Sequence, residues 1–256
     1  MDKLMDAVSI IGAGNVATHL ALNLKNKGFN IYSVSSKNSL SAKVLAAQVD
    51  AIVIDDLRSI PSGNLVLVCV NDEAIKLVLS QISLDNPIIY TAGNVEISAL
   101  PKRPNLGVFY PLQTFSKEQD LQLSEVPFLI EANNHLFAEL IFQIAKKISN
   151  YVVYADSIER KKLHLGAVFI NNFTNHLVYL SKKYLESQQL NWEILKPLLE
   201  ETFKKLKSVE PYEAQTGPAR RNDQETIKDH IQKLEGSSKE IYEAISKSIL
   251  ETYQTK

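Results

Sequence analysis

A glycine-rich stretch near the start of the chain has the pattern of a nucleotide-binding turn. An apolar segment leads into Gly12-Ala-Gly14-Asn-Val-Ala17, and an amphipathic helix follows. The first glycine permits a tight turn, the second lets the backbone approach a pyrophosphate, and the alanine allows close packing of helix on strand. The free N–H groups at the start of the helix would then face the phosphates. The pattern predicts a dinucleotide site that includes Gly12, Gly14, Asn15, Val16 and Ala17.

The residues after the second predicted strand bear on which dinucleotide is bound. NAD enzymes place an Asp or Glu there, about 20 residues beyond the glycines, to bind the ribose 2′-hydroxyl. This chain instead has Ser35, Ser36 and Lys37, without a carboxylate. Hydroxyls and an ammonium group can hold a 2′-phosphate through charge-assisted hydrogen bonds, so we predict NADP as the cofactor. The same residues would also suit an ordinary polar loop with a helix cap at Ser39.

A second polar turn is expected beside the cofactor. Val70 and Asn71 stand at the end of the fourth predicted strand, Leu65–Val70. Ligands of open parallel sheets bind outside the carboxyl ends of the strands. We therefore place Asn71 and the helix start at Asp72 near the nicotinamide ribose, and include Val70 and Asn71 among the cofactor-binding residues. The alternative is that Asp72 simply caps the next helix.

A polar stripe interrupts the apolar pattern of the longest predicted helix. In a regular α-helix His164, Asn171 and Asn175 would fall within about 20° of one line. Asn172 and His176 would form a neighbouring i, i+4 pair. Each such group, buried without a partner, costs about 1–3 kcal/mol, so a polar pocket that receives a substrate would account for them. A hydrogen-bonded network in a helical core or dimer interface is the other interpretation. The candidate catalytic residues on this helix are His164, Asn171, Asn175 and His176.

Two loops add further candidates. The segment Phe109–Phe115 begins at the end of a strand and offers Tyr110 and Gln113 as parts of a substrate site. Tyr110 is also a candidate general acid, as are the histidines. In the helical half, the loop Gln215–Asp223 contains Arg220, which suits recognition of a carboxylate or phosphate. Each loop also has a purely structural interpretation, as an aromatic crossover and as a capped turn with solvated arginines.

The elements that must position these residues alternate in the first part of the chain. Short apolar segments alternate with amphipathic ones up to Tyr154, which indicates a doubly wound, mostly parallel sheet with helical crossovers. The predicted strands are Ala7–Ile11, Asn30–Ser35, Ala51–Ile54, Leu65–Val70, Pro87–Thr91, Gly107–Tyr110, Pro127–Ile130 and Tyr151–Tyr154. The predicted helices between them are Val16–Lys27, Ser39–Gln48, Asp72–Ile82 and His135–Ser149.

The spacing of apolar residues changes after Ala155, and from there on it predicts only helices. The predicted helices of this part are Ser157–Ser187, Trp192–Ser208, Asp223–Leu234 and Lys239–Tyr253. Asp156 and Asn191 are suited to cap the first two of them. We predict an α/β Rossmann domain over residues 1–154 that binds NADP. An all-α domain over residues 155–256 would contribute to substrate binding and to dimerisation.

Composition limits the classes of partner. The 256 residues include 28 basic and 29 acidic side chains and are 45% hydrophobic, which gives no indication of nucleic acid or a membrane surface as a partner. No apolar run approaches the roughly 20 residues that span a bilayer. A single cysteine, Cys69, excludes an internal disulfide, so we expect a cytoplasmic location. Cys69 suits a small buried hydrophobe better than a nucleophile, and no metal site is predicted.

Five segments carry a resemblance to a known group of enzymes. They are Gly12–Ala17, Thr91–Asn94, Gly107–Phe115, Asn171–His176 and Gln215–Asp223. With them the whole chain resembles the dehydrogenases that join a Rossmann domain to a helical domain, among them pyrroline-5-carboxylate reductase, 6-phosphogluconate and 3-hydroxyacid dehydrogenases and the deazaflavin:NADP oxidoreductases. It is most similar to an uncharacterised branch labelled NADP oxidoreductases. The resemblance implies the fold, a pyridine nucleotide and a homodimer formed through the helical domain, but no particular substrate. Gly93 is included with the cofactor-binding candidates.

The resemblance also narrows the chemistry. The hydroxyacid dehydrogenases of this group carry a lysine one turn before an asparagine on the corresponding helix, whereas here Ala167 precedes Asn171. We therefore expect an NADP-dependent oxidoreductase that transfers hydride between NADP(H) and a small carbonyl or imine, with imine reduction ahead of hydroxyacid oxidation. A non-catalytic NADP-binding sensor or partner subunit is the alternative, because no proton donor is obvious. A scaffold that binds no nucleotide is a third reading.

Overall fold

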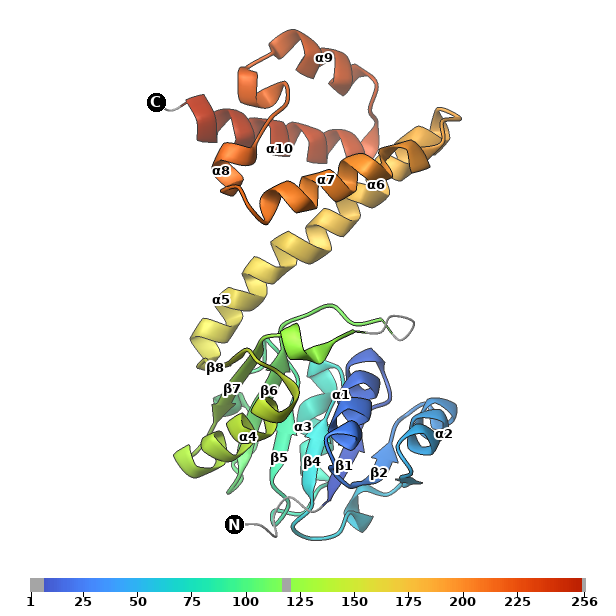
Figure 1. Ribbon diagram of the computed structural model, residues 1–256, viewed down its shortest axis with the longest axis vertical. Helices are drawn as coiled ribbons and strands as arrows, with labels where there is room; N and C mark the ends of the chain where they lie inside the picture. Colours follow the sequence, from blue (N-terminus) through green and yellow to red (C-terminus); the bar gives the residue numbers. More distant parts are fainter. Residues whose placement is uncertain (1–6, 117–120, 255–256) are drawn as a thin grey trace. The chain divides into compact units, whose positions relative to one another are not determined.

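The computed structural model describes residues 7–116 and 121–254, and its strands form one eight-stranded sheet (Figure 1). The order across the sheet is β3-β2-β1-β4-β5-β6-β7-β8. The strands are β1 (Val8–Ile11), β2 (Ile31–Ser35), β3 (Ile52–Val53), β4 (Leu65–Val68), β5 (Ile88–Tyr90), β6 (Leu106–Pro111), β7 (Phe128–Ala132) and β8 (Val152–Tyr154). Each segment predicted as a strand forms one, and the predicted Rossmann-type α/β fold is confirmed.

Two strands, β7 and β8, run in the opposite direction to the other six. β7 pairs with β6 in the antiparallel direction, while every other neighbouring pair is parallel. A parallel neighbour needs a crossover of a dozen or more residues, usually a helix. The described part of the connection between β6 and β7 contains only a short 3-10 turn at Leu123–Glu125. β7 therefore returns directly alongside β6.

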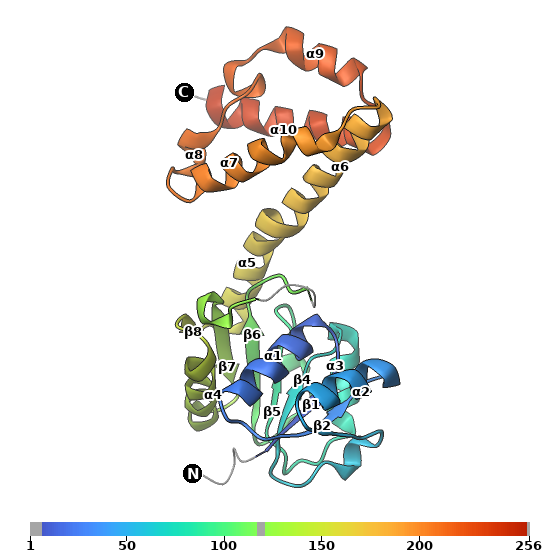
Figure 2. The ribbon, with the colours of Figure 1, turned by 45° about the vertical axis from the view of Figure 1, so that its right-hand side comes forward.

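Helices cover both faces of the sheet. α1 (Asn15–Asn26), α2 (Ser39–Gln48) and α4 (His135–Ile148) pack on one face, and α3 (Asp72–Ser80) packs on the other (Figures 1 and 2). Successive residues of a strand point to opposite faces. Leu65 and Leu67 of β4 accordingly belong to the first of these two cores, and Val66 and Val68 to the second. Burial of a side chain of this size contributes about 1.5–3 kcal/mol, which explains why the strands are apolar throughout.

The capping residues predicted from sequence, Asp156 and Asn191, do cap helical segments of the second part of the chain. Asp156 accepts hydrogen bonds from the backbone N–H groups of Ile158 and Glu159, and the Glu159 carboxylate accepts one from the backbone N–H of Asp156. This capping box starts α5 (Ser157–Ala167). Asn191 likewise caps the 3-10 turn Trp192–Leu195, which leads into α7 (Lys196–Leu206). The remaining helices are α6 (Thr174–Ser187), α8 (Pro211–Ala214), α9 (Gln224–Gln232) and α10 (Gly236–Gln254).

The longest helix is not α-helical throughout. Between α5 and α6, residues Val168–Phe173 form a π-helix, so the prediction of one α-helix over Ser157–Ser187 is wrong at this stretch. A π turn bonds residue i to residue i+5 and holds one residue more than an α turn. Apolar periodicity alone does not reveal such an insertion.

The chain divides into two compact units. Met1–Asn172 form the first and Phe173–Lys256 the second. The sheet ends at Tyr154, whereas α5 belongs to the first compact unit, in which Arg160 forms an ion pair with Glu131 of β7. The domain boundary after residue 154 stays a prediction. Within the described ranges, no helix is both long and apolar enough to cross a membrane.

Candidate functional site

A cavity of about 1090 Å³ lies in the first unit at the carboxyl edge of the sheet. Its walls come from the start of α1, the segments after β4 and β5, the loop after β6, and the helical stretch from Lys162 to Asn172. This edge is where open α/β sheets bind their ligands. The volume slightly exceeds the usual range of small-molecule sites, about 300–1,000 Å³.

The glycine turn has a different requirement at each glycine. Gly12 has a φ of +114°, and a Cβ there would stand 2.1 Å from the carbonyl oxygen of Cys69. Only glycine fits this position without moving the backbone. Gly14, in contrast, is exposed, and a Cβ on it would meet no atom within 4 Å. The space in front of Gly14 is thus open to a ligand.

The start of α1 faces the same cavity. Gly14 is the N-cap residue, and no side chain caps the helix there. Gly14, Asn15, Val16 and Ala17 all line the cavity. An uncapped helix start presents backbone N–H groups and a positive dipole end to an anion. The open cradle and the donors therefore fit the diphosphate of a dinucleotide.

The segment predicted to bind a 2′-phosphate adjoins the glycine turn. The backbone N–H of Gly12 donates to the carbonyl of Ser35 at 2.7 Å. The hydroxyl of Ser36 accepts from the N–H of Asn38 at 3.3 Å, and Lys37 is exposed. Asn38, rather than Ser39, is the cap of α2, through a bond from the N–H of Ser41. The serines and the lysine thus lie at the end of the strand next to β1.

The turn after β4 also lies where the sequence predicts. Val70 and Asn71 line the cavity together with Asp72. Asn71 is the N-cap residue of α3 and makes no side-chain cap bond, while Asp72 is the first residue of the helix. The alternative in which Asp72 caps this helix is therefore wrong. The Asn71 side chain has no capping role that would keep it from a ligand.

Gly93 has a packing role in this structure. A Cβ at Gly93 would stand 2.6 Å from the ring of Tyr110, and the Gly93 carbonyl accepts a bond from Nε of Arg160 at 3.2 Å. Gly93 is not among the residues that line the cavity. The absence of a side chain lets the Tyr110 ring lie against this backbone.

Tyr110 and His164 form a hydrogen-bonded pair at the cavity wall. The Tyr110 hydroxyl and Nδ1 of His164 are 2.9 Å apart, and both residues line the cavity. Partial burial raises the pKa of Tyr110 above its ordinary value, and the negative charge of Asp72 adds to this effect. Tyr110 is therefore protonated at neutral pH. The pair provides a hydroxyl proton with a histidine partner, the arrangement that a general acid needs.

The π-helical stretch changes which asparagine follows His164. One inserted residue shifts all later residues by one position around the helix. Asn172 then takes the place relative to His164 that a regular α-helix would give to Asn171, so the predicted alignment of His164 with Asn171 does not hold. Both Asn171 and Asn172 line the cavity. The sequence analysis paired Asn172 with His176 but did not include it among the candidate catalytic residues.

Of the other predicted site residues, one lines this cavity and three belong to the second unit. Gln113 lines the cavity, and its side-chain oxygen accepts from the N–H of Thr114 at 2.9 Å. Asn175, His176 and Arg220 belong to the second unit. The ring of His176 stacks on Tyr179 with centroids 5.9 Å apart. The guanidinium of Arg220 lies 4.1 Å from the ring centroid of Tyr253, a cation–π contact.

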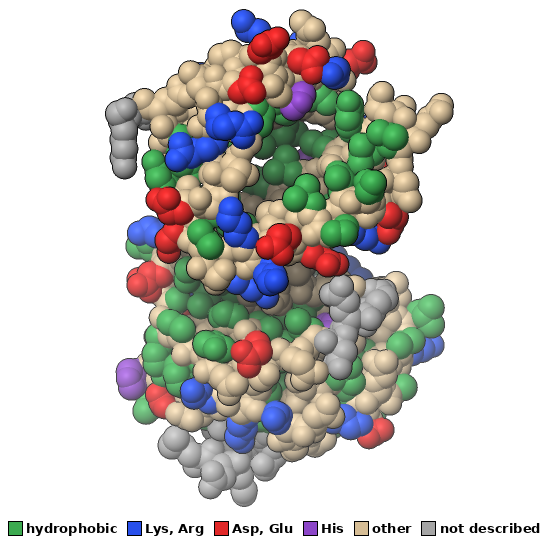
Figure 3. Space-filling view, turned by 45° about the horizontal axis from the view of Figure 1, so that its top comes forward, with side chains coloured by type: hydrophobic (Ala, Val, Ile, Leu, Met, Phe, Trp, Pro, Cys, Tyr) green, Lys and Arg blue, Asp and Glu red, His purple; other side chains and the backbone are tan. Residues whose placement is uncertain are grey.

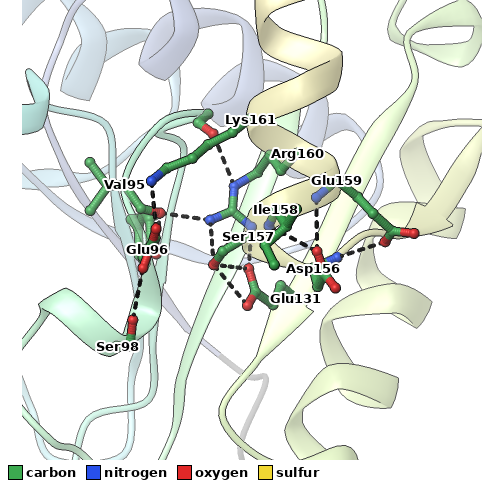
Figure 4. Close-up of polar contacts among 12 residues, drawn as sticks. Val95, Glu96, Ser98, Glu131, Asp156, Ser157, Ile158, Glu159, Arg160 and Lys161 are labelled. Carbon is green, nitrogen blue, oxygen red and sulfur yellow. Dashed lines mark hydrogen bonds and ion pairs between the residues drawn. The ribbon is translucent and has the colours of Figure 1, made fainter.

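Arg160 was missed by sequence reasoning and is completely buried. Its polar contacts are shown in Figure 4. It forms an ion pair with Glu131 of β7 and donates to the carbonyls of Gly93 and Val95, the latter at 2.6 Å. Ser157 links the two charges by donating to Glu131 at 2.9 Å. The network fastens α5, which carries His164, to β7 and to the segment behind Tyr110. A lone Arg in a helix gives no signal of burial, because Arg is seldom buried unless paired.

Cys69 lies at the cavity but is not suited to act as a nucleophile. Burial raises the pKa of its thiol to about 12, so the reactive thiolate is scarce near neutral pH. Within residues 7–116 and 121–254, no group of three or more His, Cys, Asp or Glu side chains is arranged to hold a metal ion.

Comparison with known proteins identifies the family. Residues 7–94 match the family described as "NADP oxidoreductase coenzyme F420-dependent", and residues 126–249 match a domain of unknown function, DUF2520. A Bacteroides fragilis protein described as a "putative NADP oxidoreductase" is 38% identical, with 98% of this chain and 100% of that chain covered and a TM-score of 0.89. The chain belongs to this NADP oxidoreductase family. A search among curated proteins finds no match.

More distant structures share the fold of this NADP oxidoreductase. An imine reductase from Myxococcus stipitatus, solved in complex with NADP+, is 10% identical, with 97% of this chain and 93% of that chain covered and a TM-score of 0.62. The 1-pyrroline-5-carboxylate reductase of Streptococcus pyogenes is 12% identical, with 98% of each chain covered and a TM-score of 0.60. Family membership confirms both the resemblance stated from sequence and NADP as the cofactor.

Proposed function

We propose that this NADP oxidoreductase transfers hydride between NADP(H) and a small carbonyl or imine compound. The observation that carries the proposal is that the open glycine turn and the Tyr110–His164 pair line the same cavity. NADPH bound there would supply the hydride. The first turn of α1 would hold the diphosphate, and Ser35, Ser36 and Lys37 the 2′-phosphate.

In this proposal Tyr110 is the proton donor for the reduction. Its hydroxyl has its proton at neutral pH, and the His164 ring holds the hydroxyl in place at 2.9 Å. Transfer of the Tyr110 proton to the substrate oxygen or nitrogen would complete the reduction, and His164 would share the charge left on the phenol oxygen. Asn171, Asn172 and Gln113, which all line the cavity, would orient the polar group of the substrate. Imine reduction is favoured over hydroxyacid oxidation because Ala167 stands where the hydroxyacid dehydrogenases carry lysine.

Replacing Tyr110 with phenylalanine tests this role. Y110F removes the transferable proton, and loss of a positioned general acid typically lowers turnover by about 10²–10⁴. NADPH oxidation is measured with a panel of cyclic imines and small ketones, and NADPH affinity by calorimetry. We expect kcat to fall and the Kd of NADPH to stay within about twofold.

The matched control for Y110F is Y151F. Tyr151 is 54% exposed and lies outside the cavity, so its replacement should leave turnover unchanged. Equal turnover in Y110F and wild type would refute the role of Tyr110. Tight NADPH binding by the wild type without oxidation of NADPH on any panel member would favour the non-catalytic sensor or partner subunit instead.

We also propose that the protein is a homodimer formed through its second unit. Of the described residues from Phe173 onward, only Ala219, Ile227 and Ser246 are buried. An independently folded unit normally has a hydrophobic core of its own. Instead, a cavity of about 640 Å³ with mainly apolar walls opens between α6, α9 and α10, and Figure 3 shows hydrophobic side chains around a hollow in this unit. A second copy would cover these side chains.

A carboxylate in this region is expected to weaken the dimer. Leu177 is 40% exposed and borders both this cavity and a smaller one beside α7. In L177E the buried charge would oppose association, so the sedimentation-equilibrium mass should shift from twice 28.7 kDa toward 28.7 kDa. L40E is the control, because Leu40 is 72% exposed on α2 of the first unit. A wild-type protein that sediments as a monomer at all concentrations would exclude the homodimer.

A further inference from the structure

The loop Leu112–Ser116, which forms one wall of the cavity, is bonded to α1 by two side chains. Nδ2 of Asn15 donates to the carbonyl of Phe115 at 2.8 Å. Nε2 of His19 lies 2.8 Å from the carbonyl oxygen of Ser116. A carbonyl oxygen can only accept a hydrogen bond, so Nε2 of His19 has a proton and donates it. The His19 ring also contacts the Phe115 ring, with centroids 5.4 Å apart.

The spacing of the two donors explains how they hold the loop. Asn15 and His19 are four residues apart and therefore lie one above the other on the same face of α1. They reach the carbonyls of two consecutive loop residues. His19 is only 8% exposed and is not among the residues that line the cavity. The loop wall is thus joined to the helix whose first turn faces the predicted diphosphate.

We infer that His19 is a positioning residue for nucleotide binding, which acts through the loop Leu112–Ser116 rather than by touching the nucleotide. Leu112, Gln113, Thr114 and Phe115 line the same cavity as the start of α1. A loop already held in the binding conformation does not have to be ordered when the ligand arrives, and this increases affinity. The inference rests on the proposed function in one respect, namely that NADPH occupies this cavity.

The chain offers a matched control on the same face of α1. Asn23 lies one turn beyond His19, and its Nδ2 donates to the backbone carbonyl of His19 at 3.0 Å. This side chain is similarly placed and hydrogen-bonded, but its bond to the His19 carbonyl stays within the helix. N23A should therefore remove a side-chain bond from α1 without affecting the loop. H19Q retains an N–H donor of similar reach and serves as the conservative variant.

The test compares H19A, H19Q and N23A with the wild type by two measurements. The first is amide hydrogen exchange of peptides that cover residues 112–116, made without nucleotide. The second is calorimetric titration with NADPH. We expect H19A to exchange about fivefold faster or more in these peptides and to bind NADPH about tenfold more weakly. N23A should match the wild type in both measurements, and H19Q should recover most of the loss.

The outcomes separate this inference from the proposed function. Faster exchange in H19A with unchanged NADPH affinity would show that the loop does not serve the nucleotide, and the inference would be wrong. Weaker binding with unchanged exchange would show that His19 does not act through the loop, which also overturns it. If the wild type binds no NADPH, the proposed function fails. The exchange comparison would then still show whether His19 holds the loop.

Discussion

Replacing Gly14 with aspartate is expected to abolish NADPH binding without unfolding the protein. Gly14 is the N-cap residue of α1, and a side chain there meets no atom within 4 Å. Asp is a favoured N-cap residue because its carboxylate accepts bonds from the first helical N–H groups. The fold should therefore tolerate G14D. The same carboxylate would occupy the anion site and repel the diphosphate, so we expect the Kd of NADPH to rise at least about 100-fold, or about 2.7 kcal/mol.

Two variants make this result specific. G14N has nearly the same shape as G14D without the charge, so the difference between the two measures electrostatic repulsion alone. G12A, unlike G14D, should lower the stability of the fold, because its Cβ would stand 2.1 Å from the carbonyl oxygen of Cys69. Calorimetry with NADPH and thermal unfolding are measured on all three. NADPH binding by G14D at wild-type strength would show that the diphosphate is not held at this turn.

Replacing Arg160 with methionine should cause a large loss of stability. Arg160 is completely buried, and its guanidinium donates hydrogen bonds to Glu131, Ser157 and two backbone carbonyls. Removing one partner of a buried ion pair typically costs about 3–5 kcal/mol, because the other charge loses its compensation. The Glu131 side chain is 20% exposed and can regain some water, so the lower end of this range is expected. Urea denaturation measures the change in unfolding free energy.

The double variant R160M/E131Q distinguishes the causes of this loss. It removes the uncompensated charge as well as the pair, and should recover part of the stability lost in R160M. R160K should not restore the wild type, since an ammonium group cannot reproduce the forked donors that reach four acceptors. A loss below about 1 kcal/mol in R160M would mean that the network is not needed to hold α5 on the sheet.

Local signals in the sequence predicted much of the first unit. The two glycines, the apolar strands and the helix caps act through near neighbours and through burial on both faces of a sheet. α2, for example, spans Ser39–Gln48 as predicted, because its cap and its apolar spacing lie within one short segment. The direction of β7 could not be predicted in this way, because apolar strands read alike whether they pair parallel or antiparallel.

The candidate site was only partly visible in the sequence, for a related reason. Tyr110 and His164 were each selected as candidates. Their hydrogen bond could not be predicted, because 54 positions separate them in the sequence. The bond that joins His19 to the loop spans 97 positions. The π-helical stretch Val168–Phe173 then moves Asn172 into the place expected for Asn171. The residue types of a helix do not indicate that it contains such a π-helical turn.

The amino-acid sequence by itself determined the order of strands and helices and the nucleotide-binding turn, because glycine conformation, capping and apolar periodicity are local properties. Only the tertiary structure decided that Arg160 is buried against Glu131, that Tyr110 and His164 meet, and that His19 holds the loop beside the cavity. The physical reason is that a charge or a hydrogen-bonding group can be buried only where partners from distant segments satisfy it. Those partners are brought together by the packing of α1 and α5 against the sheet.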